Sequence, residues 1–189
     1  LGKRSEITSV AMKEEIDIQG AEIIDPDPEK HHEEFKEIVK LYLGKRTGIS
    51  ENAAKIVLTR PKRLPLSYGA GMVALGKADC MVAGKACESS EVITAIKMLV
   101  GTNKGVKTPS GGFLMCSQSE DVGTRGKLIL SDIAFTECPK DAKELSNIAV
   151  NTAQDVADYI SGDVKLAFVS GKNVESSKVK ETVRITKEA

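Results

Sequence analysis

The sequence predicts an α/β fold, in which helices alternate with strands that pair mostly in parallel. Three observations lead to this prediction. Apolar residues recur at helical spacing in several segments, short apolar runs typical of buried strands lie between them, and Gly or Pro residues separate the two kinds of segment. A hairpin pattern in the second half of the chain further indicates two α/β sub-domains, which we place at residues 1–107 and 108–189.

The first elements are short and end at a marked break. Residues 5–15 are predicted to form a helix, and the apolar residues of segments 16–18 and 21–24 indicate extended structure. Two Asp-Pro steps follow at residues 25–28. They stop regular structure, because the residue before a proline avoids the α region.

Three helices are predicted next. Residues 30–42 carry apolar side chains at helical spacing, and Ser50 is a suitable N-cap for a helix over residues 51–58. Residues 68–75 are rich in Gly and Ala, so we expect a helix that packs closely on a sheet.

A strand, a loop and a helix then follow each other directly. Residues 80–83 are apolar and predict a buried strand, residues 84–90 a turn, and residues 91–100 a helix capped by Ser89 or Ser90. In open α/β sheets, ligands bind beyond the carboxyl ends of strands, where loop amides and helix N-termini favour anions. The loop with Gly84 and Lys85 is therefore a candidate anion site.

The second half of the chain repeats the alternation. Residues 112–116 and 127–134 are candidate strands of a hairpin, and residues 141–160 form an amphipathic helix. A further buried strand is predicted at residues 164–169 and a last helix at residues 177–186.

Composition and charge exclude several functional classes. The chain has 189 residues with 27 Lys+Arg and 27 Asp+Glu, so no basic excess exists to neutralise the phosphates of a nucleic acid. No segment approaches the roughly 20 apolar residues that span a bilayer. The four cysteines lack the close pairing of a structural zinc site and are typical of reduced thiols, so we expect a cytoplasmic protein.

Common nucleotide and hydrolase motifs are missing from the sequence. It contains no GxxxxGK[ST], no GxGxxG after a strand and no GxSxG. His31 and His32 are adjacent, so on a helix they point about 100° apart and do not share a metal ion easily. These motifs therefore give no reason to expect an NTPase, a dinucleotide enzyme, an α/β-hydrolase or a metal centre.

A basic cluster has two open interpretations. Lys45, Arg46, Arg60, Lys62 and Arg63 form either a solvated surface or a grip for an anionic ligand such as the phosphates of a nucleotide-like cofactor. Later in the chain, Ser170 and Lys172 follow a predicted buried strand and could face the same ligand, whereas Asp132 is better explained as a carboxylate that braces a loop.

Several of these segments together resemble one family. The chain is similar to the phosphate acetyltransferase and phosphate butyryltransferase family in segments that follow the family's order along nearly the whole chain. These include YGAGMV at residues 68–73, GKADCMVAG at 76–84, FLM at 113–115 and LSDIA at 130–134.

The resemblance implies a fold and an activity. Members have two α/β sub-domains with mostly parallel sheets and an active site in the cleft between them, an architecture like that of isocitrate and isopropylmalate dehydrogenases. They transfer a short acyl group reversibly between coenzyme A and inorganic phosphate. No metal takes part in the chemistry, coenzyme A is a substrate, and the usual assembly is a homodimer.

The resemblance also implies roles for individual residues. Lys45 or Arg46 would bind the phosphates of coenzyme A. Ser170 and Lys172 would belong to the catalytic groups. The expected ligands of the phosphate or acyl phosphate are Gly84, Lys85, Ser89, Ser90 and Ser110.

The sequence departs from the family pattern at several positions. Glu88 stands where a neutral hydroxyl is expected, and Thr94 stands where the family has an arginine. The family's opening strand would precede Leu1 and its closing sub-domain would follow Ala189, so we expect a shortened relative or part of a longer protein. Two alternatives therefore stay open: a divergent, non-catalytic relative that binds an anion or coenzyme A in a regulatory role, and an unrelated anion-binding α/β protein.

Overall fold

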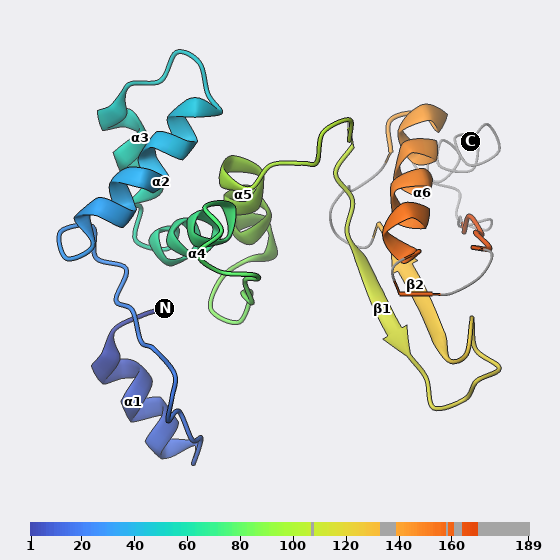
Figure 1. The fold of residues 1–189 in the computed structure, drawn as a ribbon, viewed down its shortest axis with the longest axis horizontal. Helices are drawn as coiled ribbons and strands as arrows, with labels where there is room; N and C mark the ends of the chain where they lie inside the picture. Colours follow the sequence, from blue (N-terminus) through green and yellow to red (C-terminus); the bar gives the residue numbers. More distant parts are fainter. Residues whose placement is uncertain (107, 133–138, 158, 161–163, 170–189) are drawn as a thin grey trace, which may run out of the picture. The chain divides into compact units, whose positions relative to one another are not determined.

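The structure, a computed structural model, describes residues 1–106, 108–132, 139–157, 159–160 and 164–169. The chain separates into two compact units, Leu1–Gly101 and Thr102–Ala189. The mixture of helices and strands agrees with the predicted α/β class. The elements of the first unit are α1 (Arg4–Lys13), α2 (His32–Gly44), α3 (Glu51–Leu58), α4 (Leu64–Ala74) and α5 (Ser89–Leu99), and those of the second are β1 (Gly112–Cys116), β2 (Lys127–Ser131) and α6 (Ala142–Val156) (Figure 1).

Four helices of the first unit share one hydrophobic core. Helix α2 contacts α3, α4 and α5, and α4 also packs along α5. In α2, α3 and α5 the apolar side chains recur on one face, and that face is buried while the charged residues stay in solvent. Helix α4 contains no charged residue, and its consecutive residues 66–71 are all buried. The buried core residues are Phe35, Ile38, Val39, Tyr42, Ala54, Leu58, Leu66, Tyr68, Ala70, Ala95, Met98 and Leu99.

The glycines of α4 allow close contact with its neighbours. A Cβ added to Gly71 would lie 2.6 Å from Cγ1 of Ile38, and one added to Gly69 would lie 2.8 Å from Sδ of Met81. The sequence predicted that this small-residue helix packs on a sheet. In the structure, the close partner of Gly71 is another helix, α2.

Local signals set the starts of two helices. Ser50 is the N-cap of α3, as predicted, and its hydroxyl accepts a hydrogen bond from the amide of Ala53 at 3.3 Å. Helix α4 begins at Leu64, earlier than expected, and has Pro65 in its first turn. A proline is tolerated there, because the amide it lacks would have no intrahelical partner.

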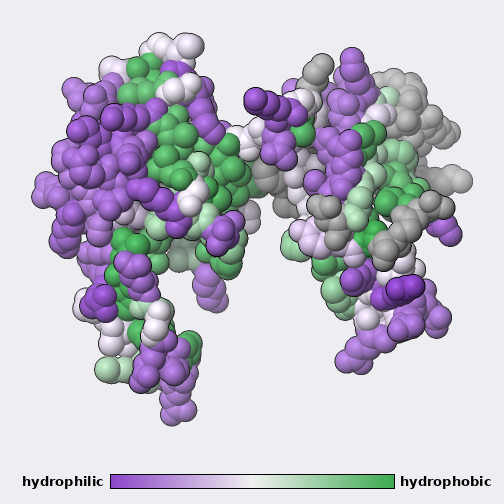
Figure 2. All heavy atoms as spheres, viewed as in Figure 1, coloured by the Kyte–Doolittle hydropathy of each residue, from purple (hydrophilic) through white to green (hydrophobic). Residues whose placement is uncertain are grey.

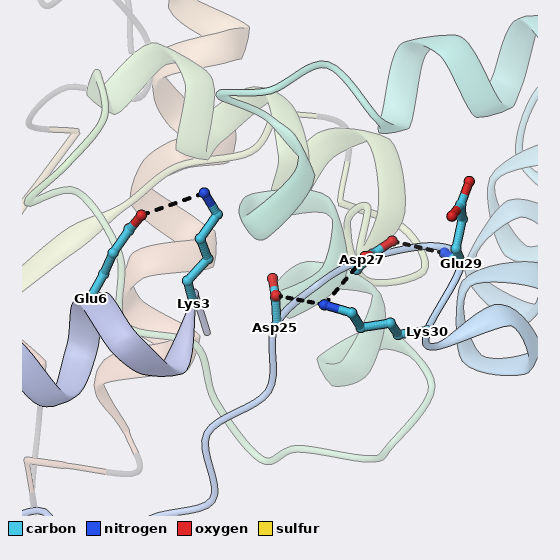
Figure 3. Close-up of polar contacts among 6 residues, drawn as sticks. All are labelled: Lys3, Glu6, Asp25, Asp27, Glu29 and Lys30. Atoms are coloured by element: carbon cyan, nitrogen blue, oxygen red, sulfur yellow. Dashed lines mark hydrogen bonds and ion pairs between the residues drawn. The ribbon is translucent and has the colours of Figure 1, made fainter.

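Ion pairs brace the turn that precedes α2 (Figure 3). The ammonium of Lys30 lies 3.2 Å from Oδ2 of Asp25 and 3.5 Å from Oδ2 of Asp27. Asp27 also accepts a hydrogen bond from the amide of Glu29, which, with the nearby Lys30 charge, lowers the pKa of its carboxyl. The hydrogen bond to Asp25, helped by the charges of Asp25 and Asp27, raises the pKa of Lys30. The predicted break at residues 25–28 is thus an ordered turn.

The predicted parallel strands are not found among the described residues. Segments 16–18, 21–24, 80–83 and 164–169 form no strand, and Val82 is 97% exposed. The described sheet is antiparallel and consists of β1 and β2. An apolar run becomes a strand only when a neighbouring strand satisfies its backbone N–H and C=O groups, and in the described structure these four segments have no such neighbour.

The second unit contains the predicted hairpin. In its register, Phe113 pairs with Leu130 and Met115 with Leu128. These four side chains lie on one face of the hairpin and are 40–57% exposed. Figure 2 shows hydrophobic residues at the surface of this unit. Strand β2 ends at Ser131, earlier than predicted, and residues 133–134 lie outside the described residues.

Helix α6 packs against β2 and confirms the predicted amphipathic helix. Its N-cap is Asp141, whose carboxylate accepts a hydrogen bond from the amide of Glu144 at 2.8 Å. In return, the carboxylate of Glu144 accepts a hydrogen bond from the amide of Lys140, so two backbone amides at the start of the helix have side-chain acceptors. No helix in the described part of the chain is both long enough and apolar enough to cross a membrane. The helix predicted at residues 177–186 lies outside the described residues.

Candidate functional site

The predicted anion loop lies immediately before α5. Gly84 has a φ of +115°, a conformation that favours glycine, and a Cβ there would meet no atom within 4 Å. Lys85, Ser89 and Ser90 are exposed. Helix α5 starts at Ser89, two residues earlier than predicted, with Glu88 as its N-cap. Neither serine is therefore the cap, and both lie in the first turn, where backbone amides lack intrahelical acceptors.

The charges around this helix start oppose each other. The N-terminal end of a helix carries a partial positive charge, and Lys85 adds a full one close by in the chain. Glu88 stands at the N-cap, and its side chain makes no capping hydrogen bond. Its carboxylate stabilises the helix end but also reduces the attraction of this end for a phosphate. The loop thus combines the features of an anion site with one repulsive group.

Thr94, at the position of the arginine that the resemblance implies, does not replace its function. Its hydroxyl donates to the carbonyl oxygen of Ser90 at 2.7 Å, within the same helix. A threonine carries no charge, and here its hydroxyl proton is already donated to the backbone of its own helix. The described loop therefore relies on Lys85 and the helix amides for positive potential.

Lys45 follows α2 and contacts the other end of α5. Its ammonium donates to the carbonyl oxygens of Leu99 at 2.5 Å and Val100 at 2.7 Å. Carbonyl groups in the last turn of a helix lack intrahelical donors and carry a partial negative charge, so a cation is stabilising there. Helix α5 has 11 residues, which places this contact about 15 Å from the start of the helix.

Arg46 takes a different environment from its neighbour Lys45. Its guanidinium lies 5.9 Å from the ring centroid of Tyr42, a cation–π arrangement on α2. Arg46 is exposed, and no carboxylate of the described residues forms an ion pair with it. Of the two predicted coenzyme ligands, Arg46 therefore has the more accessible charge.

Ser110 belongs to the second unit, in the segment that leads into β1. Two residues before it, the carbonyl oxygen of Thr108 accepts a hydrogen bond from the side-chain amide of Asn151 on α6 at 3.3 Å. One residue after it, the carbonyl oxygen of Gly111 accepts from the amide of Asp132 at 2.8 Å. Asp132 has a φ of +59°, which is uncommon for a residue other than glycine. Ser110 is thus held from both sides.

Helix α6 also holds the end of β2. The hydroxyl of Thr152 lies 2.6 Å from that of Ser131 and donates to the carbonyl oxygen of Ile148 at 2.8 Å, so the Ser131 hydroxyl is the donor between them. The sequence pattern predicted the amphipathic helix but identified neither Asn151 nor Thr152 as a contact residue. Neither contact had a recognisable sequence signal, because each joins residues far apart in the chain.

The predicted catalytic residues Ser170 and Lys172 lie outside the described residues. Among the residues that the structure does describe, no three His, Cys, Asp or Glu side chains are grouped so that they could hold a metal ion.

His31 lies against Tyr68, with 5.9 Å between the ring centroids. Burial, together with the charge of Glu34, raises the pKa of the Tyr68 hydroxyl.

Comparison with known proteins gives a consistent result along the whole chain. A family model described as phosphate acetyl/butaryl transferase matches residues 1–189. The phosphate acetyltransferase of Treponema pallidum is 33% identical over 100% of this chain, that of Clostridium acetobutylicum 30% over 99%, and that of Acetivibrio thermocellus 29% over 99%. The chain spans 54–57% of the length of these three relatives. It belongs to the phosphate acetyltransferase and phosphate butyryltransferase family.

Proposed function

We propose that the protein is a phosphate acyltransferase, which transfers an acetyl or similar short acyl group reversibly between coenzyme A and inorganic phosphate. The observation that carries this proposal is the family match over residues 1–189, together with relatives named phosphate acetyltransferase that align with nearly all of the chain. Because the chain spans little more than half of those relatives, the activity is proposed for the whole protein.

The proposed reaction is a substitution at the acyl carbon. The thiolate of coenzyme A attacks the carbonyl carbon of the acyl phosphate, a C–S bond forms, and the C–O bond to phosphate breaks. Inorganic phosphate leaves with the electron pair of that bond, and the reverse direction regenerates the acyl phosphate. The protein contributes by holding the two reactants in line and by stabilising the charge on phosphate, and no metal is needed for these steps.

The loop before α5 supplies candidate groups for the phosphate. Gly84 leaves the backbone open, Lys85 supplies a positive charge, and Ser89 and Ser90 supply hydroxyls at the positive end of a helix. Their exposure supports this role. We propose that Ser110 adds a hydroxyl from the second unit, and that Ser170 and Lys172 act at the reacting carbonyl.

The predicted coenzyme ligands follow α2. Arg46 has an exposed guanidinium, which suits the phosphates of coenzyme A because it can donate two parallel hydrogen bonds. Lys45 was predicted for the same role, although its ammonium is already bonded to α5. Coenzyme A is an elongated molecule whose nucleotide and thiol are far apart, so a site remote from the acyl phosphate suits its nucleotide end.

The finer architecture belongs to the same proposal. The active site would lie in a cleft between two α/β sub-domains, residues 1–107 and 108–189, with mostly parallel sheets in the whole protein. We further propose a cytoplasmic homodimer with no nucleic-acid or membrane partner, in line with the balanced charge of the chain.

A second candidate function is favoured by one pair of residues. Glu88 stands at the N-cap position of α5, and Thr94 bonds to its own helix, so a charge that repels phosphate is present and a charge that would attract it is missing. These two residues suit a non-catalytic relative that binds coenzyme A or another anion as a regulatory module.

One experiment distinguishes the two functions. Thioester formation is followed with coenzyme A and acetyl, propionyl or butyryl phosphate, on protein of verified intact mass. Turnover with any of the three supports the acyltransferase. A folded protein that binds coenzyme A without turnover supports the binding module. Turnover that appears only in the Glu88→Ser, Thr94→Arg double variant would indicate an acyltransferase site weakened by these two residues.

A further inference from the structure

We infer that Lys45 is a positioning residue for the phosphate loop and not a ligand of coenzyme A. The inference rests on the proposed function, because it assigns a role within that site. It starts from the two hydrogen bonds between the Lys45 ammonium and the carbonyl oxygens of Leu99 and Val100, at 2.5 and 2.7 Å.

These contacts use two of the three N–H groups of the Lys45 ammonium, at the C-terminal end of α5. The amides of Val100 and Gly101 both donate to the carbonyl oxygen of Ile96, so the chain turns sharply there and presents the carbonyls of Leu99 and Val100 outward. Lys45 fills this position with a full positive charge at the negative end of the helix. A phosphate that accepted the third N–H would lie beside two carbonyl oxygens with partial negative charge, which repel it.

The contacts also connect two helices at one defined point. Lys45 is the C-cap of α2, so its backbone is fixed by that helix, and Leu99 is fully buried in the core at the end of α5. The loop with Lys85 lies at the opposite end of α5. Because a helix behaves as a rigid rod over about 15 Å, a shift of its C-terminal end moves its N-terminal end as well.

The two adjacent cations, Lys45 and Arg46, therefore have different roles. Lys45 sets the position of α5 and thereby of Lys85, Ser89 and Ser90, whereas Arg46 keeps its charge available for the coenzyme. Removal of the Lys45 charge should therefore raise KM for phosphate and leave KM for acetyl-CoA unchanged. A direct coenzyme ligand would give the opposite result.

The test uses the full chain and three variants. Lys45→Met removes the charge but keeps the apolar stem, Lys45→Arg keeps donors for both carbonyls, and Lys40→Met is the control, an exposed lysine on the same helix. KM for inorganic phosphate and KM for acetyl-CoA are measured in the direction that forms acetyl phosphate. Amide hydrogen exchange of residues 96–101 is measured on the same samples and needs no activity.

We expect Lys45→Met to raise KM for phosphate by about tenfold, below the roughly hundredfold loss that a 1 Å misplacement can cause. KM for acetyl-CoA should match that of Lys40→Met, exchange at residues 96–101 should be faster, and Lys45→Arg should restore both. A rise in KM for acetyl-CoA with an unchanged KM for phosphate overturns the inference, as does a variant indistinguishable from Lys40→Met.

If Lys45→Met fails to fold, Lys45→Gln retains a donor for the carbonyls and should give the same pattern with a smaller change. If the wild-type protein transfers no acyl group, the proposed function fails by itself. The exchange at residues 96–101 then still decides whether Lys45 holds the end of α5.

Discussion

Replacement of Gly71 by alanine should destabilise the first unit, although alanine is the better helix former. In the interior of a helix, Gly→Ala alone stabilises by about 0.5–1 kcal/mol. Here the new Cβ would lie 2.6, 2.7 and 3.0 Å from Cγ1, Cδ1 and Cγ2 of Ile38. Ile38 is 1% exposed and belongs to the core, so its side chain cannot move aside into solvent. Overpacking of this kind costs about 1–3 kcal/mol, and we expect a net loss of about 1–2 kcal/mol in unfolding free energy.

The chain offers a matched control for this prediction. Gly44 ends α2, and a Cβ there would meet no atom within 4 Å, so Gly44→Ala should leave stability unchanged or raise it. Equilibrium urea unfolding, followed by circular dichroism, gives the free energy for each variant. Ile38→Ala should cost less in the Gly71→Ala background than in the wild type, because it removes all three clashing atoms. A Gly71→Ala protein as stable as Gly44→Ala would refute the close contact of α4 with α2.

Three further predictions concern the loop, the turn and α6. Glu88→Ser should lower KM for phosphate by about two- to fivefold, the size expected for one exposed charge; an unchanged or higher KM would contradict the proposed repulsion. Hydrogen bonding lowers the pKa of the Asp27 carboxyl below its ordinary value of 3.8. The ionised carboxyl therefore contributes fully to the free energy of unfolding above pH 3.8, and this contribution is lost as the pH falls through the lower pKa of the folded state. An NMR titration of the Asp27 carboxyl should have its midpoint below 3.8, and a midpoint at or above it would be inconsistent with the turn. Thr152→Val should cost about 1 kcal/mol in urea unfolding relative to Thr152→Ser, because only serine keeps the acceptor for Ser131; equal stabilities would show that the contact contributes nothing.

Features fixed by neighbouring residues were predictable from the sequence. The cap at Ser50, the break at residues 25–28 and the amphipathic helix that became α6 all depend on groups a few positions apart. The hairpin of β1 and β2 is also local, since its strands are neighbours in the chain and their connection, residues 117–126, contains the turn residues Gly123 and Gly126. Periodicity and turn chemistry are sufficient for such elements.

Features that depend on distant partners were not predictable. Residues 80–83 have the apolar composition of a buried strand, but a strand also needs a neighbour, and local composition does not show whether one is present. Lys45 shows the same limit for the site. A lysine near other cations favours an anion ligand, yet the partners of Lys45 are backbone carbonyls 54 and 55 residues away. Backbone carbonyls occur at every residue and leave no sequence signal.

The proposed transfer of an acyl group between sulfur and a phosphate oxygen is tested most directly with labelled acetyl phosphate. A heavy-oxygen label is placed at the oxygen that bridges carbon and phosphorus, and the full chain is incubated with this substrate and coenzyme A. Attack of the thiolate at the carbonyl carbon predicts acetyl-CoA together with inorganic phosphate that contains all of the label. Folded wild-type protein that forms no thioester, or that releases the label in acetate, would contradict the proposed acyl transfer.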